Sequence, residues 1–219
     1  MRPDLTPDEC RVLGTIIEKA LTTPNQYPLT LNALVTGVNQ KSNRWPVVTI
    51  DDMQALRAID GLRSKGLVRE VSMSGSRVEK YRHVAREVLG CGTNELVLLT
   101  ELMLRGPQTV GELRTHGSRM ATFESLESVE AVLGELARAE QPFVRELPPA
   151  PGSRAPRWTQ LLCPTLHPLD AAPSAHAEAS HPATAPGASS ALEERVAALE
   201  ARVAELVGRL EALTRSLGA

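Results

Sequence analysis

The stretch Leu67-Val68-Arg69-Glu70-Val71-Ser72-Met73-Ser74-Gly75-Ser76-Arg77-Val78-Glu79-Lys80-Tyr81-Arg82-His83-Val84 has the pattern of a β-hairpin. Residues 67–72 and 78–84 are predicted as its two strands. Residues 73–77 are predicted as the turn, in which Gly75 supplies the unusual backbone angle.

Parts of this hairpin occur a second time in the chain. Val68-Arg69-Glu70 returns as Val144-Arg145-Glu146, and Gly75-Ser76-Arg77 returns as Gly152-Ser153-Arg154. Two matches in the same order, 76 and 77 residues apart, indicate an internal duplication.

Three helices are predicted before the first hairpin. Thr6-Pro7-Asp8-Glu9 reads as a capping box that opens the first helix. The second helix is centred on Leu34 and ends near Asn39, and a polar loop follows it at residues 40–46. The third is predicted to be capped by Thr49 and to end at Lys65-Gly66, with an inward row of Met53, Leu56, Ile59 and Leu62.

The same order of elements is predicted before the second hairpin. Residues 93–104 form its first helix, Thr109-Val110-Gly111-Glu112 caps its second, and its third buries the row Val129, Val132, Leu133 and Leu136. Three helices and a hairpin are typical of a winged-helix domain. We therefore predict a mainly α fold with small β-hairpins (α+β): a winged-helix domain at residues 1–90, a second at 91–163, and two separate small cores.

The composition changes after Cys163. Residues 164–190 are rich in Pro, Ala, Ser and His, which predicts a disordered linker. Residues 191–217 then carry apolar side chains at alternating steps of four and three, which is typical of a coiled coil. In the first half of this helix Val196 and Val203 occupy heptad position a and leucines occupy position d, which favours a parallel dimer. The dimer contacts are predicted at Leu192, Val196, Leu199, Val203, Leu206, Leu210, Leu213 and Leu217.

Composition narrows the class of protein. No apolar run is long enough to cross a membrane and the chain starts without a signal-peptide pattern, so we expect a cytoplasmic protein with no membrane partner. Cys10, Cys91 and Cys163 are far apart in sequence and are interpreted as buried thiols. No phosphate loop, HExxH or serine elbow is present, so neither an enzyme, a metal site nor a cofactor is expected.

Several stretches resemble the bacterial YceH-like family. They are residues 21–29, 39–44, 104–109 and 111–114, together with the C-terminal leucine-rich helix. The resemblance implies paired winged helices along nearly the whole chain. It implies no particular activity, because fold does not dictate function.

The charge is distributed unevenly, although the net charge is only −2. Between residues 63 and 86 lie seven Lys and Arg against Glu70 and Glu79, on the end of the third helix and on the hairpin. A winged helix on DNA places phosphate contacts there. The predicted DNA-binding residues are Lys41, Asn43, Arg44, Arg63, Lys65, Arg69, Arg77, Lys80 and Arg82.

Four observations keep other interpretations open. Charged side chains are also typical of a hairpin that is simply exposed to solvent. Trp45, within the polar loop, fits a local turn folded onto the core. Asp51 and Asp52 at the start of the third helix oppose DNA. The second domain is acidic in its third helix, which suits a protein partner. The sequence thus favours double-stranded DNA binding by the first domain, with a protein-interaction scaffold as the alternative.

Overall fold

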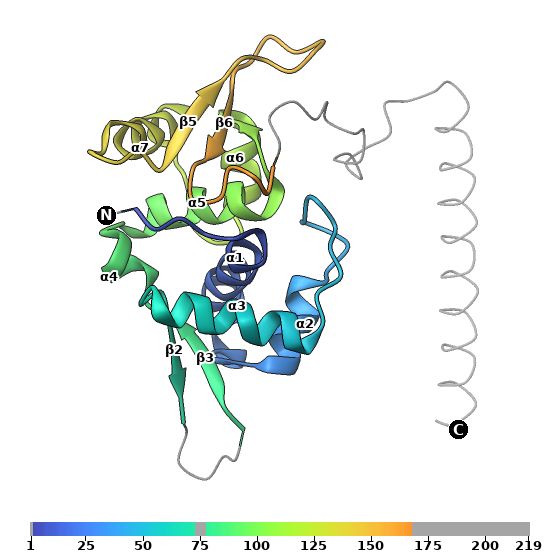
Figure 1. The fold of residues 1–219 in the computed structure, drawn as a ribbon. Helices are drawn as coiled ribbons and strands as arrows, with labels where there is room; N and C mark the ends of the chain where they lie inside the picture. The colour runs from blue at the N-terminus through green and yellow to red at the C-terminus, as the bar shows by residue number, and fades with distance from the viewer. Residues whose placement is uncertain (1, 73–77, 168–219) are drawn as a thin grey trace, which may run out of the picture. The chain divides into compact units, whose positions relative to one another are not determined.

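The computed structural model describes residues 2–72 and 78–167, which form an α+β fold with one order of elements present twice (Figure 1). The first repeat contains α1 (Pro7–Thr22), η1 (Pro24–Gln26), β1 (Leu29–Thr30), α2 (Leu31–Val38), α3 (Asp52–Ser64), β2 (Val68–Val71) and β3 (Lys80–His83). A short helix, α4 (Ala85–Leu89), precedes the second repeat. That repeat contains α5 (Thr93–Arg105), β4 (Gln108–Thr109), α6 (Val110–Gly117), α7 (Leu126–Arg138), β5 (Val144–Leu147) and β6 (Arg157–Gln160).

Each repeat has a three-stranded antiparallel sheet of the same topology. The strand orders are β1-β3-β2 and β4-β6-β5. In the first sheet Leu29 pairs with Tyr81, and in the second Gln108 pairs with Trp158. The duplication inferred from the two hairpins is therefore also present in the short strand that precedes each second helix.

Side chains cap the helices largely where the sequence predicts. Thr6 and Glu9 form the predicted capping box of α1, and Thr109 and Glu112 form that of α6. The prediction for α3 is wrong: Asp51 rather than Thr49 is the N-cap. The Asp51 carboxylate accepts the backbone N–H of Gln54, so this acid serves a donor that the first helical turn leaves free.

The buried face of α3 also differs from the predicted row. Ile59 and Leu62 are buried as expected, but Met53 is 61% exposed. Ala55 and Ala58 take the inward positions instead. Starting the helix at Asp52 leaves Met53 in the first turn, outside the packed stripe, and small alanines let α3 approach α1 closely.

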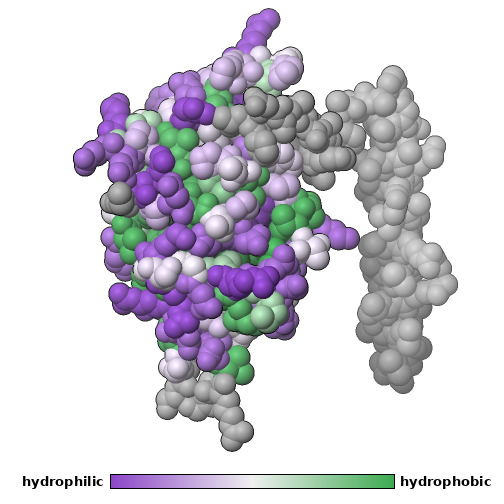
Figure 2. Space-filling model, in the orientation of Figure 1, coloured by the Kyte–Doolittle hydropathy of each residue, from purple (hydrophilic) through white to green (hydrophobic). Residues whose placement is uncertain are grey.

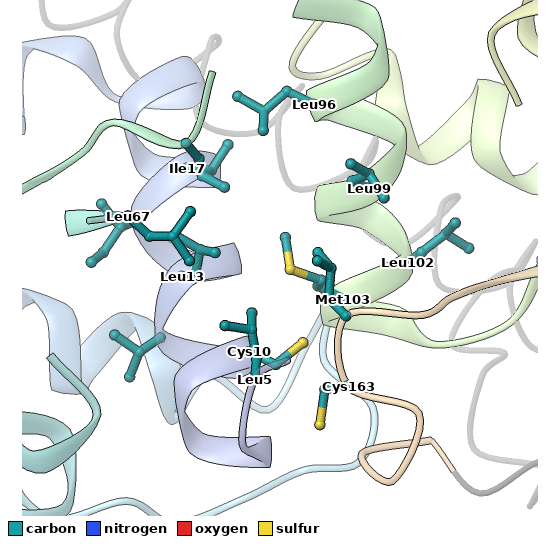
Figure 3. Close-up of a cluster of buried hydrophobic side chains, with 14 of the residues drawn as sticks. Leu5, Cys10, Leu13, Ile17, Leu67, Leu96, Leu99, Leu102, Met103 and Cys163 are labelled. Carbon is teal, nitrogen blue, oxygen red and sulfur yellow. The ribbon is translucent and has the colours of Figure 1, made fainter. Parts of the chain in front are cut away.

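The buried side chains form one continuous core, not the two separate cores that were predicted. Helices α1 and α5 lie side by side at its centre and belong to different repeats (Figure 3). Leu13 and Ile17 of α1 face Leu96, Leu99 and Met103 of α5 in this view. Both helices are buried on nearly every side. A helix of a single small domain usually buries only one face, so α1 and α5 each need the other repeat to cover their remaining faces.

The described chain extends past the predicted start of the linker. Leu166 and His167 are buried, at 6% and 1% exposure, so the assignment of these two residues to a disordered linker is wrong. The hairpin turn with Arg77, the predicted linker after residue 167 and the predicted coiled coil lie outside the described residues.

All three cysteines are buried and free, as predicted. Cys10 and Cys163, remote in sequence, are neighbours in space, and burial together with Cys163 raises the pKa of the Cys10 thiol. The backbone N–H of Leu5 donates to the carbonyl of Leu162 at 2.8 Å, so the end of the second repeat is tied to the beginning of the first.

Candidate nucleic-acid interface

The β2–β3 hairpin carries a cationic face. Arg69 lies directly opposite Arg82, and Val71 opposite Lys80. Because side chains alternate along a strand and directly paired residues point the same way, Arg69, Lys80 and Arg82 share one face. We call these three residues the hairpin cations. None of them forms an ion pair with another residue in the part of the chain that the structure describes.

The opposite face of the hairpin holds it to the core. Val68 and Tyr81 are 2% and 3% exposed and lie on this face, with Glu70 directly opposite Tyr81. The Tyr27 hydroxyl accepts the backbone N–H of His83 at 2.8 Å, which anchors the base of β3. Burial of one face thus points the hairpin cations away from the core. Figure 2 shows mostly hydrophilic surface over this hairpin, with a few apolar side chains.

Two other predicted contact residues are already paired. Arg63 lies 3.3 Å from the Asp60 carboxylate and 3.4 Å from that of Glu70. The Lys65 ammonium lies 2.6 Å from the Glu9 carboxylate, which is itself nearly buried. Both cations are at the end of α3, but phosphate binding would have to compete with these carboxylates.

Arg44 is placed inside the protein. Its side chain has no exposed surface, and its guanidinium pairs with the Glu18 carboxylate and donates to the carbonyls of Asn43 and Gly37. It also donates to Gln40 Oε1 at 3.2 Å. A phosphate has no access to this side chain in the structure, so Arg44 acts as a support of the polar loop.

Lys41 and Asn43 lie on the exposed part of that loop. Asn43 has a positive φ of 60°, a left-handed conformation that Asn tolerates better than most residues. Its side-chain oxygen accepts a hydrogen bond from Arg105 Nη2 at 2.6 Å. Lys41 therefore remains an exposed cation on a loop that is fastened to the second repeat.

A buried charge network, not predicted from the sequence, joins the two repeats. Glu18 of α1 binds Arg44 of its own repeat and Arg119 of the second, whose Nη1 is 2.5 Å away. Glu101 of α5 binds the same Arg119 at 2.8 Å and Arg105 at 2.9 Å. Both carboxylates are at most 1% exposed, whereas Arg119 and Arg105 are 30% and 21% exposed.

The electrostatics of the network favour the charged forms of Glu18 and Arg119. Burial alone would raise the pKa of Glu18, but hydrogen bonds and charges from Arg44 and Arg119 outweigh it and lower this pKa below its ordinary value. Burial also disfavours charge on Arg119, yet Glu101 and Glu18 raise its pKa. Glu18 and Arg119 are thus each held charged by a partner from the other repeat.

Trp45 and His167 close the same junction. Their rings stack with centroids 5.2 Å apart and an angle of 15° between planes. His167 Nε2 lies 2.7 Å from the Trp45 carbonyl, to which it can donate when that nitrogen carries the proton. The Trp45 backbone N–H donates to the carbonyl of Leu104. Burial lowers the pKa of His167 to about 4, so the ring is neutral at neutral pH.

The two third helices offer little to DNA. On α3 the exposed acids Asp52 and Asp60 offset the exposed bases Arg57 and Arg63. On α7 the exposed charged residues are mainly acidic: Glu127, Glu130 and Glu135 against Arg138. Carboxylates at these positions repel phosphates.

Within the described residues the chain has neither a membrane-spanning helix nor a cluster of metal-ligating side chains. No helix in the ranges 2–72 and 78–167 is long and apolar enough to cross a membrane. Within the same ranges, no group of three or more His, Cys, Asp and Glu side chains is arranged to hold a metal ion.

Comparison with known proteins identifies the family of this chain. Residues 5–153 match the family described as "Protein of unknown function, DUF480". A "UPF0502 protein" of Leptothrix cholodnii is 52% identical over 163 residues, covering 74% of this chain and 72% of the relative. A second, from Citrifermentans bemidjiense, is 52% identical over 162 residues, covering 74% and 75%. The chain belongs to this family.

Two of the stretches that resemble the YceH-like family, residues 39–44 and 104–109, meet at the junction of the repeats. The loop 39–44 contributes Arg44 and Asn43, and the stretch 104–109 contributes Arg105, the partner of Asn43. In this family member these stretches therefore support the assembly of the two repeats. The hairpin cations lie outside them.

Proposed function

We propose that each repeat is a winged-helix domain and that the first repeat binds double-stranded DNA through the β2–β3 hairpin. The element order and the three-stranded sheet of each repeat support the winged-helix assignment. The proposal assigns binding in the cytoplasm and no catalytic step.

The observation that carries the proposal is the contrast between paired and unpaired cations. Arg44, Arg63 and Lys65 each have a carboxylate partner, whereas Arg69, Lys80 and Arg82 have none within the described chain. Three like charges on one face repel each other, and this repulsion is relieved when a polyanion binds.

The mode of contact supported best is with phosphates. The exposed row of α3 is balanced in charge, and the hairpin cations lie on a strand pair instead of on a helix that could enter the major groove. Phosphate contacts carry no sequence information. We therefore expect duplex binding that depends strongly on salt and weakly on sequence.

The proposal includes a dimer formed by residues 191–217, as the heptad pattern predicts. Two first repeats in one dimer would grip two duplex segments, and a long linker would tolerate different spacings between them.

A salt titration tests DNA binding. The wild-type chain and the variant Arg69→Ala/Lys80→Ala/Arg82→Ala are titrated onto a mixed-sequence duplex between about 50 and 200 mM salt. Three phosphate contacts contribute roughly 2.7 to the slope of log affinity against log salt, which is about a 40-fold change over that range. The triple variant should lose this part of the salt dependence.

A matched control keeps the charge. Arg69→Lys/Arg82→Lys preserves two positive charges at the same positions and should retain most of the salt slope. Absence of wild-type binding at the lowest salt refutes the proposal, and so does a salt slope that the triple alanine variant leaves unchanged.

A protein-interaction scaffold is the second candidate. The exposed acidic row of α7 favours it, because carboxylates on a helix suit a basic protein surface better than DNA. Under this candidate Glu127→Gln/Glu130→Gln/Glu135→Gln abolishes partner binding, and the hairpin cations are dispensable.

A further inference from the structure

The tip of the second hairpin is a proline-rich loop that presents an arginine. Residues 148–156 join β5 to β6 and contain four prolines. Gly152 turns the chain at a φ of +83°, and the backbone N–H of Ser153 donates to the carbonyl of Ala150 at 2.9 Å. Arg154 follows this turn and is exposed. Prolines and a closed turn restrict the loop before any partner arrives, which lowers the entropy cost of binding.

Two more arginines lie on the strands below the tip. Arg145 is opposite Thr159, and Arg157 is opposite Leu147. Side-chain alternation therefore puts Arg145 and Arg157 on the same face of the hairpin. Neither arginine, nor Arg154, forms an ion pair within the described ranges.

The charge of this hairpin is mainly positive, with Glu146 on β5 as the one acid within β5, the tip and β6. From Leu147 to His167 the chain contains no Asp or Glu, so the tip and the strand β6 carry only positive charge. The exposed acidic row of the second repeat lies on α7, and Glu146 is on β5, outside the tip. In Figure 1 the β5–β6 hairpin extends from the opposite end of the two-repeat unit to β2–β3, and in Figure 2 its tip ends in hydrophilic atoms.

We propose that the tip of the β5–β6 hairpin inserts Arg154 into the minor groove of A·T-rich double-stranded DNA, while Arg145 and Arg157 contact the flanking phosphates. This inference rests on the proposed function, since it requires that the chain binds duplex DNA.

The dimensions and chemistry of the tip fit the minor groove. That groove is only about 6 Å wide, so it excludes a helix but admits a slim loop of Pro, Gly, Ala and Ser. A·T-rich tracts narrow it further and strengthen its negative potential, which attracts an inserted arginine. The residues beside Arg154 are Ser153 and Ala155, neither of which is bulky or acidic.

Inosine gives a direct test with the full-length chain. Three duplexes differ only in a central block of A·T, I·C or G·C pairs. Inosine removes the guanine amino group from the minor groove and leaves the major-groove edge unchanged. We expect the wild type to bind the A·T and I·C duplexes about fivefold or more tightly than the G·C duplex, the lower end of the usual cost of a mismatched pair.

Variants locate the effect. Arg154→Ala should bind all three duplexes with equal affinity, and Arg145→Ala should weaken all three by the same factor. Arg138→Ala removes an exposed cation from α7 and is the matched control; it should retain the preference. Thermal melts should coincide, because Arg154 contacts no core residue.

The outcomes separate the two proposals. Absence of any duplex binding at low salt overturns both the proposed function and this inference. Duplex binding with equal affinity for I·C and G·C overturns only the minor-groove contact. A preference that survives in Arg154→Ala overturns the assignment to Arg154.

Discussion

Replacing Glu18 by glutamine should destabilise the fold by about 3 kcal/mol. The substitution keeps the shape of the side chain and removes the charge that neutralises Arg44, whose side chain has no exposed surface. Removing one partner of a buried ion pair usually costs about 3–5 kcal/mol, because the remaining charge is buried without compensation. The lower end applies since Arg44 keeps the Gly37 and Asn43 carbonyls as acceptors.

The assay is chemical denaturation at pH 7 with matched variants. Arg119→Ala should cost about 1–2 kcal/mol, because this cation is 30% exposed and water partly replaces its loss. Arg63→Ala removes an exposed pair with Asp60 and should cost less than about 1 kcal/mol. A double-mutant cycle of Glu18→Gln with Arg44→Gln should give a coupling of about 2 kcal/mol. A Glu18→Gln cost equal to that of Arg63→Ala, or additive effects in the cycle, would refute this reasoning.

Three further predictions concern stability and assembly. The pKa of His167 lies near 4 in the folded chain and near 6.5 when unfolded, so the unfolded state binds the proton first and stability falls by about 3 kcal/mol from pH 6.5 to pH 4. His167→Gln should remove that part of the pH dependence in denaturant midpoints, and parallel curves for both proteins would contradict it. Because the core is shared, Trp45→Phe and Trp158→Phe should give coincident melting curves by fluorescence of the remaining tryptophan; two distinct transitions would indicate independent repeats. Deleting residues 189–219 should convert a dimer into a folded monomer by sedimentation, and an unchanged mass would exclude the coiled coil.

Local signals in the sequence predicted the elements well. Thr6 and Thr109 cap their helices as expected, and Val68-Arg69-Glu70 and its repeat Val144-Arg145-Glu146 lie on β2 and β5 with equivalent registers. These features depend on neighbours within a few residues. The cap of α3 was predicted at Thr49 but lies at Asp51, two residues later, and both residue types are suited to this position.

The junction of the repeats was not predicted, because it is built from contacts distant in sequence. Glu18 meets Arg119 across 101 positions, and Trp45 meets His167 across 122. One signal was available: α5 is apolar on nearly all sides from Leu96 to Leu104 yet contains Glu101. A helix apolar all round is buried, and a carboxylate within it requires a cationic partner.

The shared core bears on how two DNA contacts would combine. Two small domains joined by a flexible hinge would each bind weakly and lose entropy separately. Here α1 packs along α5, and the charge network ties the loop before α3 to the second repeat, so both hairpins belong to one unit. Once one hairpin binds, the other needs no further ordering, and the two contact energies add with little additional loss. The cost of burying Glu18 and Glu101 is therefore consistent with a junction whose role is to hold two binding elements in fixed positions.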